Sequence, residues 1–311
     1  MRGVLSQWLV RACQADGRII VLTGDHGYSL FDDIRRQCPA QYLNAGVAEQ
    51  NLIGVAAGLA KGGFRPIAYG LSAFIPIRVL EQIKLDICYE GLRVVLIGDG
   101  AGVVYSTLGS SHQCAEDIAA LRALPNMSIL SPADDHEMRA CLDEALQAQG
   151  PCYLRIGKAD RGAVHEQSLH LTAGRLLRLR TGDGPLAWIA TGSMVQTALT
   201  VAEEWPGSTV WSAPVIKPVD IEQVASICRE HEAIIVLEEH CIYGGLGSAI
   251  AEIASERAPT WVCRIGIADR FSLHCGSYSY LLSEHGLDTS GITAHVKTFL
   301  KQVNWRPPAA A

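Results

Sequence analysis

Short apolar runs at the spacing of βα units place the strongest constraint on the fold of this chain. In the first half they are Arg18–Leu22, Gln41–Leu43, Pro66–Tyr69, Arg93–Ile97, Ser128–Leu130 and Cys152–Ile156. Helical patterns lie between several of these runs. Strands that alternate with helices predict an α/β domain with a mainly parallel, doubly wound sheet that is covered on both faces.

A segment rich in turn signals separates two such series. Residues Lys158–Pro185 have no clear period, and within them Thr181–Pro185 reads Thr-Gly-Asp-Gly-Pro, which is strong turn chemistry. Four more strand-like runs follow: Leu186–Ala190, Thr209–Ser212, Ala233–Leu237 and Trp261–Arg264. The 311 residues suffice for two cores. We therefore predict two doubly wound α/β domains, residues 1–165 and 183–311, with a disordered tail at Pro307–Ala311.

Charge, hydropathy and cysteine content exclude several classes of protein. The net charge is -6, so we expect no nucleic-acid partner. No apolar stretch is long enough to span a bilayer, and the N-terminus lacks a signal-peptide pattern, so we expect no membrane contact and a cytoplasmic location. The 10 cysteines include no C-x-x-C pair, which predicts reduced thiols and no metal site on this chain.

One lone carboxylate lies in an otherwise small and apolar segment. Asn44–Ala60 reads NAGVAEQNLIGVAAGLA, which predicts a helix, and Glu49 is its only charged residue. Burying a carboxylate is costly unless it is paired or protonated, so Glu49 is a candidate acid. Alternatively, it lies in the first helical turn and stabilises the helix N-terminus. The segment by itself leaves both interpretations open.

Several motifs in order resemble one family of enzymes. The strings NAGVAEQNLIGVAAGLA, GFRPIAYGLSAF, SSHQCAEDIAALRALPNMSILSPAD and GPCYLRIGK resemble the pyrimidine-binding domain of transketolase. In the second half, VIKPVD, EEHCIYGGLGSAIAE and GLDTSGITAHVKTFL resemble the C-terminal domain of transketolase. The resemblance covers nearly the whole chain. It implies the split arrangement, in which a separate subunit carries the diphosphate-binding domain.

The resemblance implies a thiamine-diphosphate site around Glu49. This residue matches the glutamate that hydrogen-bonds the aminopyrimidine ring, where a protonated carboxyl favours the imino tautomer that removes the C2 proton of the thiazolium. Gln50 is implied to be a cofactor contact as well. Phe74 matches an aromatic residue that packs on the pyrimidine, although it can also be read as ordinary core. Leu71 stands where the family often has another aromatic residue, which implies a smaller platform.

The remaining candidate residues match the reacting end and the substrate end of the family site. His112 is implied to move protons or stabilise oxyanions. Asp25 ends the first strand, where open α/β sheets bind ligands, although a turn role is the alternative. Arg2, Ser29 and Arg155 match positions that bind a sugar phosphate, which suits arginine because it contacts phosphate oxygens in pairs. Arg2 can equally be a solvated terminal residue.

Two short patterns resemble ligand motifs by chance. Gly98-Asp99-Gly100 followed by Asn126 resembles a magnesium-diphosphate motif, but the segment matches the pyrimidine domain, so we assign it no metal. Gly244-Gly245-x-Gly247 lacks the complete dinucleotide fingerprint and is interpreted as a strand-to-helix turn. The Mg²⁺ ligands are therefore expected on the partner subunit.

Two departures from the family concern the substrate. Transketolases usually have a histidine where this chain has Gly100 and an aspartate where it has Leu108. Both family residues contact hydroxyl or carbonyl groups of the substrate, so Gly100 and Leu108 are candidate specificity positions. Cofactor activation is expected to be retained, whereas recognition of ordinary ketoses is expected to be weaker.

The predicted function is that of the C-terminal subunit of a transketolase-like enzyme. It would transfer a two-carbon ketol or acyl unit of a small-molecule substrate with thiamine diphosphate and Mg²⁺. Its partner would be an N-terminal subunit in an α2β2 heterotetramer, because such interfaces favour closed symmetry. A β-subunit-like component of a 2-oxo acid decarboxylase or dehydrogenase is one alternative. A non-catalytic assembly subunit is another.

Overall fold

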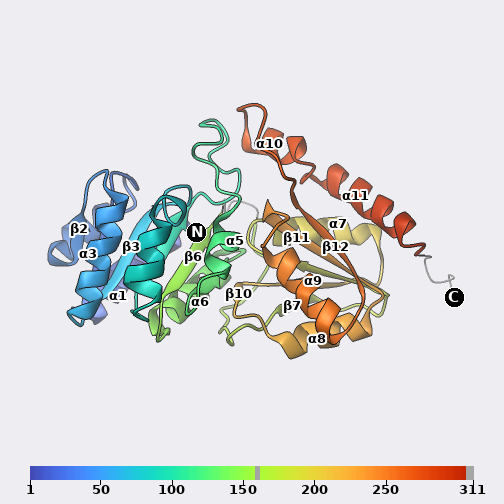
Figure 1. The fold of residues 1–311 in the computed structure, drawn as a ribbon, viewed down its shortest axis with the longest axis horizontal. Coiled ribbons are helices and arrows are strands. Elements are labelled where there is room, and N and C mark those ends of the chain that lie inside the picture. Colours follow the sequence, from blue (N-terminus) through green and yellow to red (C-terminus); the bar gives the residue numbers. More distant parts are fainter. Residues whose placement is uncertain (158–161, 306–311) are drawn as a thin grey trace.

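Two α/β domains lie side by side in the computed structural model, which describes residues 1–157 and 162–305 (Figure 1). The start of the predicted loose segment at Lys158 and the predicted disordered tail Pro307–Ala311 lie outside the described residues. The expected fold class, two α/β domains with mainly parallel sheets, is confirmed.

The first domain is built on a sheet of seven strands in the order β10-β5-β6-β4-β3-β1-β2. Its strands are β1 Ile19–Thr23, β2 Tyr42–Asn44, β3 Arg65–Leu71, β4 Val95–Asp99, β5 Ser128–Leu130, β6 Cys152–Ile156 and β10 Val215–Lys217. Its helices are α1 Arg2–Ala15, α2 Asp32–Gln37, η1 Pro39–Gln41, α3 Glu49–Lys61, η2 Ile77–Val79, α4 Leu80–Gln82, η3 Ile83–Cys88, α5 Asp117–Arg122 and α6 Asp135–Gln147. All strand pairs are parallel except β10 with β5.

Strand β10 corrects the sequence-based view of the two halves. Val215–Lys217 was not predicted as a strand, and it lies in the C-terminal half of the chain, yet it pairs antiparallel with β5 of the first sheet. Short strands at a sheet edge have weak local signals because half of their pairing partners come from far away in the chain. The C-terminal half therefore completes the sheet of the N-terminal domain.

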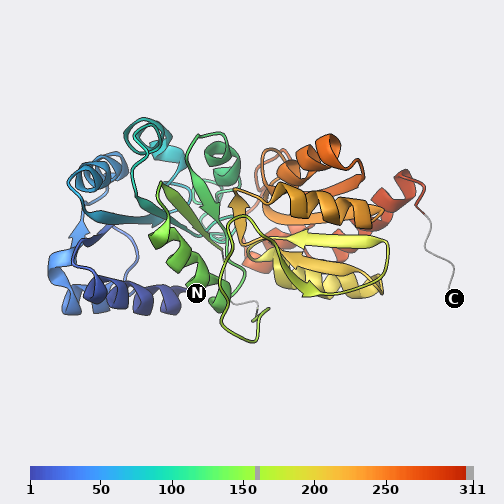
Figure 2. The same cartoon turned by 90° about the horizontal axis from the view of Figure 1, so that it is seen from below.

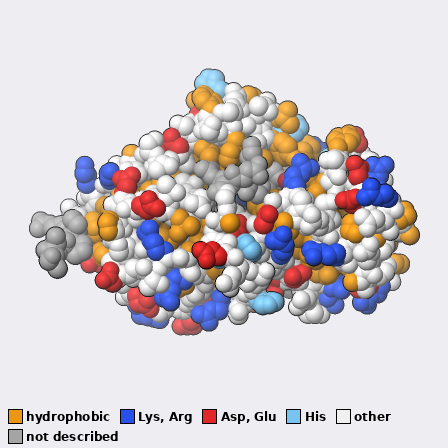
Figure 3. Space-filling model, turned by 180° about the vertical axis from the view of Figure 1, so that it is seen from behind, with side chains coloured by type: hydrophobic (Ala, Val, Ile, Leu, Met, Phe, Trp, Pro, Cys, Tyr) orange, Lys and Arg blue, Asp and Glu red, His pale blue; other side chains and the backbone are white. Residues whose placement is uncertain are grey.

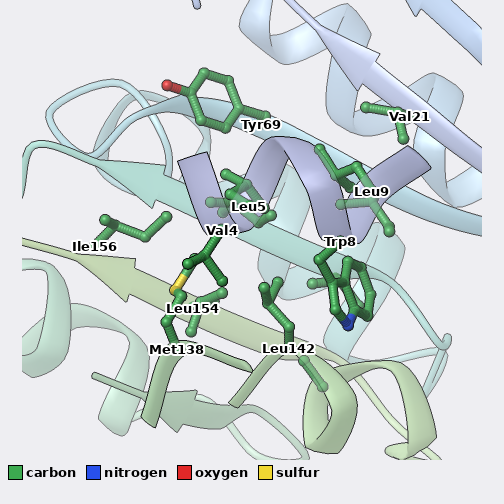
Figure 4. Close-up of a cluster of buried hydrophobic side chains, with 14 of the residues drawn as sticks. Val4, Leu5, Trp8, Leu9, Val21, Tyr69, Met138, Leu142, Leu154 and Ile156 are labelled. Atoms are coloured by element: carbon green, nitrogen blue, oxygen red, sulfur yellow. The ribbon is translucent and has the colours of Figure 1, made fainter. Parts of the chain in front are cut away.

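Two hydrophobic cores cover the faces of this sheet, as Figure 2 shows edge-on. Helices α1 and α6 pack on one face, and α3, η3 and α5 pack on the other. Figure 4 shows Leu5 and Leu9 of α1 lying between the sheet and the side chain of Leu142 from α6. These side chains are buried, and such burial contributes about 1.5–3 kcal/mol for each large aliphatic residue.

The second domain has a sheet of five strands in the order β12-β11-β8-β9-β7. Its strands are β7 Leu177–Arg180, β8 Leu186–Ala190, β9 Thr209–Ser212, β11 Ala233–Cys241 and β12 Trp261–Ile267. Its helices are α7 Met194–Val201, η4 Ala202–Glu204, α8 Ile221–Glu230, α9 Leu246–Arg257, α10 Tyr278–Glu284 and α11 Thr289–Gln302. Strand β7 lies in the segment that the sequence predicted to be loose, and it pairs antiparallel with β9 at the sheet edge.

Buried polar groups connect the two domains. The guanidinium of Arg155, at the end of β6, donates to both carboxylate oxygens of Asp117 at 3.1 and 2.9 Å, and to the carbonyl oxygen of Glu239 in β11 at 2.8 Å. The carboxylate of Glu239 accepts a hydrogen bond from the backbone N–H of Val103 at 2.8 Å. The second domain thus holds the long loop that follows β4.

The surface of the described chain carries no sign of a membrane or nucleic-acid face. Within residues 1–157 and 162–305, no helix combines the length and the apolar character needed to cross a membrane. On the face drawn in Figure 3, acidic and basic side chains are intermixed.

Candidate functional site

Glu49 is the first residue of α3 and lies almost completely out of solvent, with 3% of its surface exposed. The predicted helix starts later than expected, since Asn44 ends β2 and Gly46 has a φ of +74°. Glu49 does lie in the first turn, as one interpretation held. Its carboxylate, however, pairs with Arg78, whose Nη1 lies 2.9 Å from Oε2.

The second oxygen of Glu49 has no hydrogen-bond partner among the described residues. His26 Nε2 lies 3.6 Å from this Oε1 and also lacks a partner within the described part of the chain. Buried polar atoms are almost always hydrogen-bonded in folded proteins, so two neighbouring exceptions indicate a place where a ligand binds. A polar ring nitrogen or amine would satisfy both atoms.

Phe74 follows β3 and lies at the centre of the cluster. Its ring centroid is 5.5 Å from that of His112 and 6.0 Å from that of His26. The guanidinium carbon of Arg78 lies 4.0 Å from the Phe74 ring centroid. The structure therefore brings Glu49, Phe74 and His112 together, although 63 residues separate the first from the last (112 − 49).

His112 is carried by the loop between β4 and α5. Its Nδ1 lies 3.0 Å from Ser111 Oγ, and its ring centroid lies 6.4 Å from that of Tyr105. An isolated bridge between Gly102 and Cys114 closes the base of this loop. Since Glu239 of the second domain binds Val103 in the same loop, both domains position His112.

Gly100 has no room for the side chain that the family usually places there. Its φ is +80°, and a Cβ built on it would lie 1.9 Å from Cε2 of Tyr105. The Tyr105 ring thus occupies that space. Burial, together with the nearby charge of Asp99, raises the pKa of the Tyr105 hydroxyl to about 12, so it stays a neutral donor.

Asp25, Ser29 and Gln50 lie on the surface near this edge of the sheet. All three are exposed, and Asp25 accepts a hydrogen bond of 3.3 Å from the Tyr28 hydroxyl. Asp25 and Ser29 line a small hollow with Asn44. The turn after β1 therefore carries Asp25 as expected, with its carboxylate open to a partner or ligand.

Arg2 and Leu108 also reach the solvent. Arg2 begins α1, and its Nε lies 3.7 Å from Oδ2 of Asp99, which accepts a hydrogen bond of 2.6 Å from the Tyr69 hydroxyl. Leu108 lies in the loop that carries His112, with 53% of its surface exposed. An apolar side chain that exposed can contact a ligand or another protein chain.

Arg155 is placed differently from what its motif suggested. Its side chain is 3% exposed, and its donors are bonded to Asp117 and to the backbone carbonyls of Cys114 and Glu239. In this arrangement Arg155 fills the domain interface, where a paired buried charge is costly to break.

The two short glycine patterns have structural explanations. The carboxylate of Asp99 binds the Tyr69 hydroxyl, and the Asn126 side chain donates to the carbonyl of Cys88. In the described chain, no group of three or more His, Cys, Asp or Glu residues could hold a metal ion. The interpretation of Gly244–Gly247 as a strand-to-helix turn is confirmed, since it joins β11 to α9 and the Glu238 carboxylate binds the first amides of that helix.

Three site residues were missed by the sequence analysis: His26, Arg78 and Tyr105. His26 directly follows Asp25, and Arg78 is the only charged residue in the run from Phe74 to Leu80. A charged side chain inside an apolar run is a recognisable signal. Its partner Glu49, 29 residues earlier, was not predictable from that signal.

The fold and the site define half of a cofactor-dependent transferase. A cluster of one acid, one aromatic ring and two histidines lies at a sheet edge, with two polar atoms open to a ligand. A second α/β domain buttresses the loop that completes it. A hollow of about 1070 Å³ beside Trp261 and Trp305 in that second domain contains none of the predicted site residues.

Comparison with family models identifies both domains. Residues 1–162 match the pyrimidine-binding domain of transketolase, and residues 174–292 match its C-terminal domain. The chain belongs to the transketolase family and is a subunit of a thiamine-diphosphate-dependent transferase. It spans about half the length of the 1-deoxy-D-xylulose-5-phosphate synthases that it matches, such as that of Methylibium petroleiphilum, at 36% identity over 93% of this chain and 46% of the relative.

Other relatives are similar over their whole length. The 6-deoxy-6-sulfo-D-fructose transketolase subunit SqwH of a Clostridium species is 32% identical over 98% of this chain and 96% of the relative. One of the apulose-4-phosphate transketolase subunits of Phocaeicola vulgatus is 34% identical over 94% of this chain and 95% of the relative. A split-gene transketolase, described as an inactive beta4 tetramer, has a TM-score of 0.87 at 34% identity, with 96% and 97% of the two chains covered.

Proposed function

We propose that this chain is the C-terminal subunit of a two-chain transketolase that holds the aminopyrimidine end of thiamine diphosphate. The observation that carries the proposal is the buried Glu49 carboxylate, which leaves one oxygen unbonded beside the Phe74 ring. The cofactor, when bound, supplies the nucleophilic carbon that carries the two-carbon unit between substrates.

The residues of this chain divide the work by position. Glu49 exchanges a proton with the pyrimidine ring nitrogen, and Phe74 packs against the ring. His112 faces the reacting carbons from the loop and donates to a developing oxyanion. Gln50 and Asp25 contact the cofactor at the exposed edge, while His26 Nε2 takes a polar group of the ring.

The partner in this proposal is a separate subunit with the diphosphate-binding domain and the Mg²⁺ ligands. Two chains of each kind form a closed α2β2 assembly in the cytoplasm. The names of the full-length relatives, which describe transketolase subunits, support a partner. The described residues of this chain contain no cluster of metal ligands, which is consistent with ligands on the other subunit.

The substrate in this proposal is a ketose with an anionic end and an altered hydroxyl pattern. Leu108 replaces the polar residue of ordinary transketolases, and Tyr105 fills the space above Gly100 with a single hydroxyl donor. Arg2 and Ser29 supply the exposed contacts for a phosphate or sulfonate group. The relatives that are named for sulfo-fructose and apulose phosphate support a modified ketose.

Reconstitution tests the proposal. The chain is mixed with the diphosphate-domain subunit, thiamine diphosphate and Mg²⁺, and supplied with sugar phosphates, deoxy and sulfo ketoses, or a 2-oxo acid. Ketol transfer from a modified ketose supports the proposal. Decarboxylation of the 2-oxo acid alone would instead indicate the decarboxylase alternative, and absence of cofactor binding with any partner would indicate an assembly role.

A further inference from the structure

Arg78 contacts both groups that the proposed function assigns to the pyrimidine ring. It lies in η2, and 46% of its side chain is exposed. Its Nη1 lies 2.9 Å from Glu49 Oε2, and its guanidinium carbon lies 4.0 Å from the Phe74 ring centroid. Cation–π stacking and the ion pair together restrict the guanidinium to one orientation.

The contact leaves the two carboxylate oxygens of Glu49 in different states. Oε2 is bonded to Arg78, whereas Oε1 has no partner in the described part of the chain and lies beside His26. One oxygen is therefore fixed and the other is left for a ligand. A carboxylate held at one end is oriented without losing its second hydrogen-bonding site.

We propose that Arg78 is a positioning residue that makes Glu49 an effective proton donor to the cofactor, an inference that rests on the proposed function. The proton on the Glu49 carboxyl moves to the pyrimidine ring nitrogen, and the carboxylate left behind is neutralised by the Arg78 guanidinium. No oxidant or further reactant is needed. Because an adjacent positive charge favours the ionised carboxylate, Arg78 stabilises the state in which the ring carries the proton.

Other charged groups near Glu49 do not substitute for Arg78. His26 faces Oε1 rather than Oε2, and His112 reaches the cluster only across the Phe74 ring. Among the cation–π contacts described for this chain, that of Arg78 is the shortest, at 4.0 Å against 5.6 Å for Arg178 over Trp211. Arg178 lies in β7 of the second domain, so it offers a matched control.

The test compares Arg78→Ala, Arg78→Lys and the control Arg178→Ala in the reconstituted complex. Thiamine diphosphate affinity is measured by calorimetry, and hydrogen–deuterium exchange at C2 is measured at saturating cofactor. Nitrogen-15 NMR of a labelled cofactor reports how much of the ring nitrogen is protonated. We expect Arg78→Ala to bind the cofactor within about 3-fold of wild type, to exchange about 10-fold more slowly and to carry less ring proton.

The lysine variant separates positioning from folding. Arg78→Lys retains a charge but not the planar stack, so it should recover part of the exchange rate, while Arg178→Ala should match wild type. Equal exchange rates in wild type and both Arg78 variants would overturn the inference while leaving the proposed function intact. Absence of cofactor binding by the wild-type complex would overturn the proposed function and this inference with it.

Discussion

Replacing Glu49 by glutamine changes the acid at the centre of the site with little change in shape. The amide oxygen can still accept a hydrogen bond from Arg78, and the side chain keeps its volume against α3. What it loses is the exchangeable carboxyl proton. The substitution therefore separates proton transfer at Glu49 from the packing around it.

The expected effects on stability and rate differ in size. The ion pair with Arg78 joins a buried carboxylate to a guanidinium that is 46% exposed, and solvent screening of such a pair limits the stability loss to about 1 kcal/mol. That corresponds to a fall in melting temperature of roughly 2–4 °C. Loss of one positioned acid slows the reaction by about 10²–10⁴-fold.

The assay is deuterium exchange at C2 of thiamine diphosphate in the assembled complex, measured at saturating cofactor. Glu81→Gln is the matched control, because Glu81 is an exposed glutamate of the neighbouring α4. We expect the control to exchange like wild type and Glu49→Gln to retain cofactor while exchanging slowly. Wild-type exchange in Glu49→Gln would refute the reasoning and leave Glu49 with a structural role.

The isolated chain should be inactive and bind the cofactor weakly, and tight Mg²⁺-dependent binding to it in calorimetry would contradict the two-chain proposal. Wild-type complex should turn over ordinary sugar phosphates about 10²–10⁴-fold below a modified ketose in kcat/KM, and Leu108→Asp should narrow that gap; an unchanged ratio would show that Leu108 does not set specificity. Arg155→Met should lower the free energy of unfolding by about 3–5 kcal/mol in urea, because it leaves Asp117 buried and unpaired; a small loss coupled to a large rise in KM would favour a phosphate contact instead. Burial lowers the pKa of His165, but its hydrogen bond and charge interaction with Glu137 outweigh that effect and raise the pKa above the ordinary 6.5, so the stabilisation is present below about pH 6.5 and is lost as the pH rises through the folded-state value; the melting-temperature difference between wild type and His165→Gln should shrink over that rise, and a constant difference would contradict it.

The sequence alone determined the repeating βα order and the identity of the central acid. Strands β1, β3, β4, β6 and β8 were predictable because a buried parallel strand must be apolar along most of its length, a local property that is visible in the chain. Glu49 stood out for a related reason, since a single charge in a helix of small apolar residues is costly without a purpose.

Only the tertiary structure decided which distant residues meet. Edge strands β7 and β10 depend on pairing with β9 and β5, so their own residues carry little signal. The pairing of Arg78 with Glu49 and the burial of Arg155 arise from three-dimensional neighbours, and a motif specifies a residue type without specifying its partner. Electrostatic roles depend on distance and burial, and both are set only when the chain has folded.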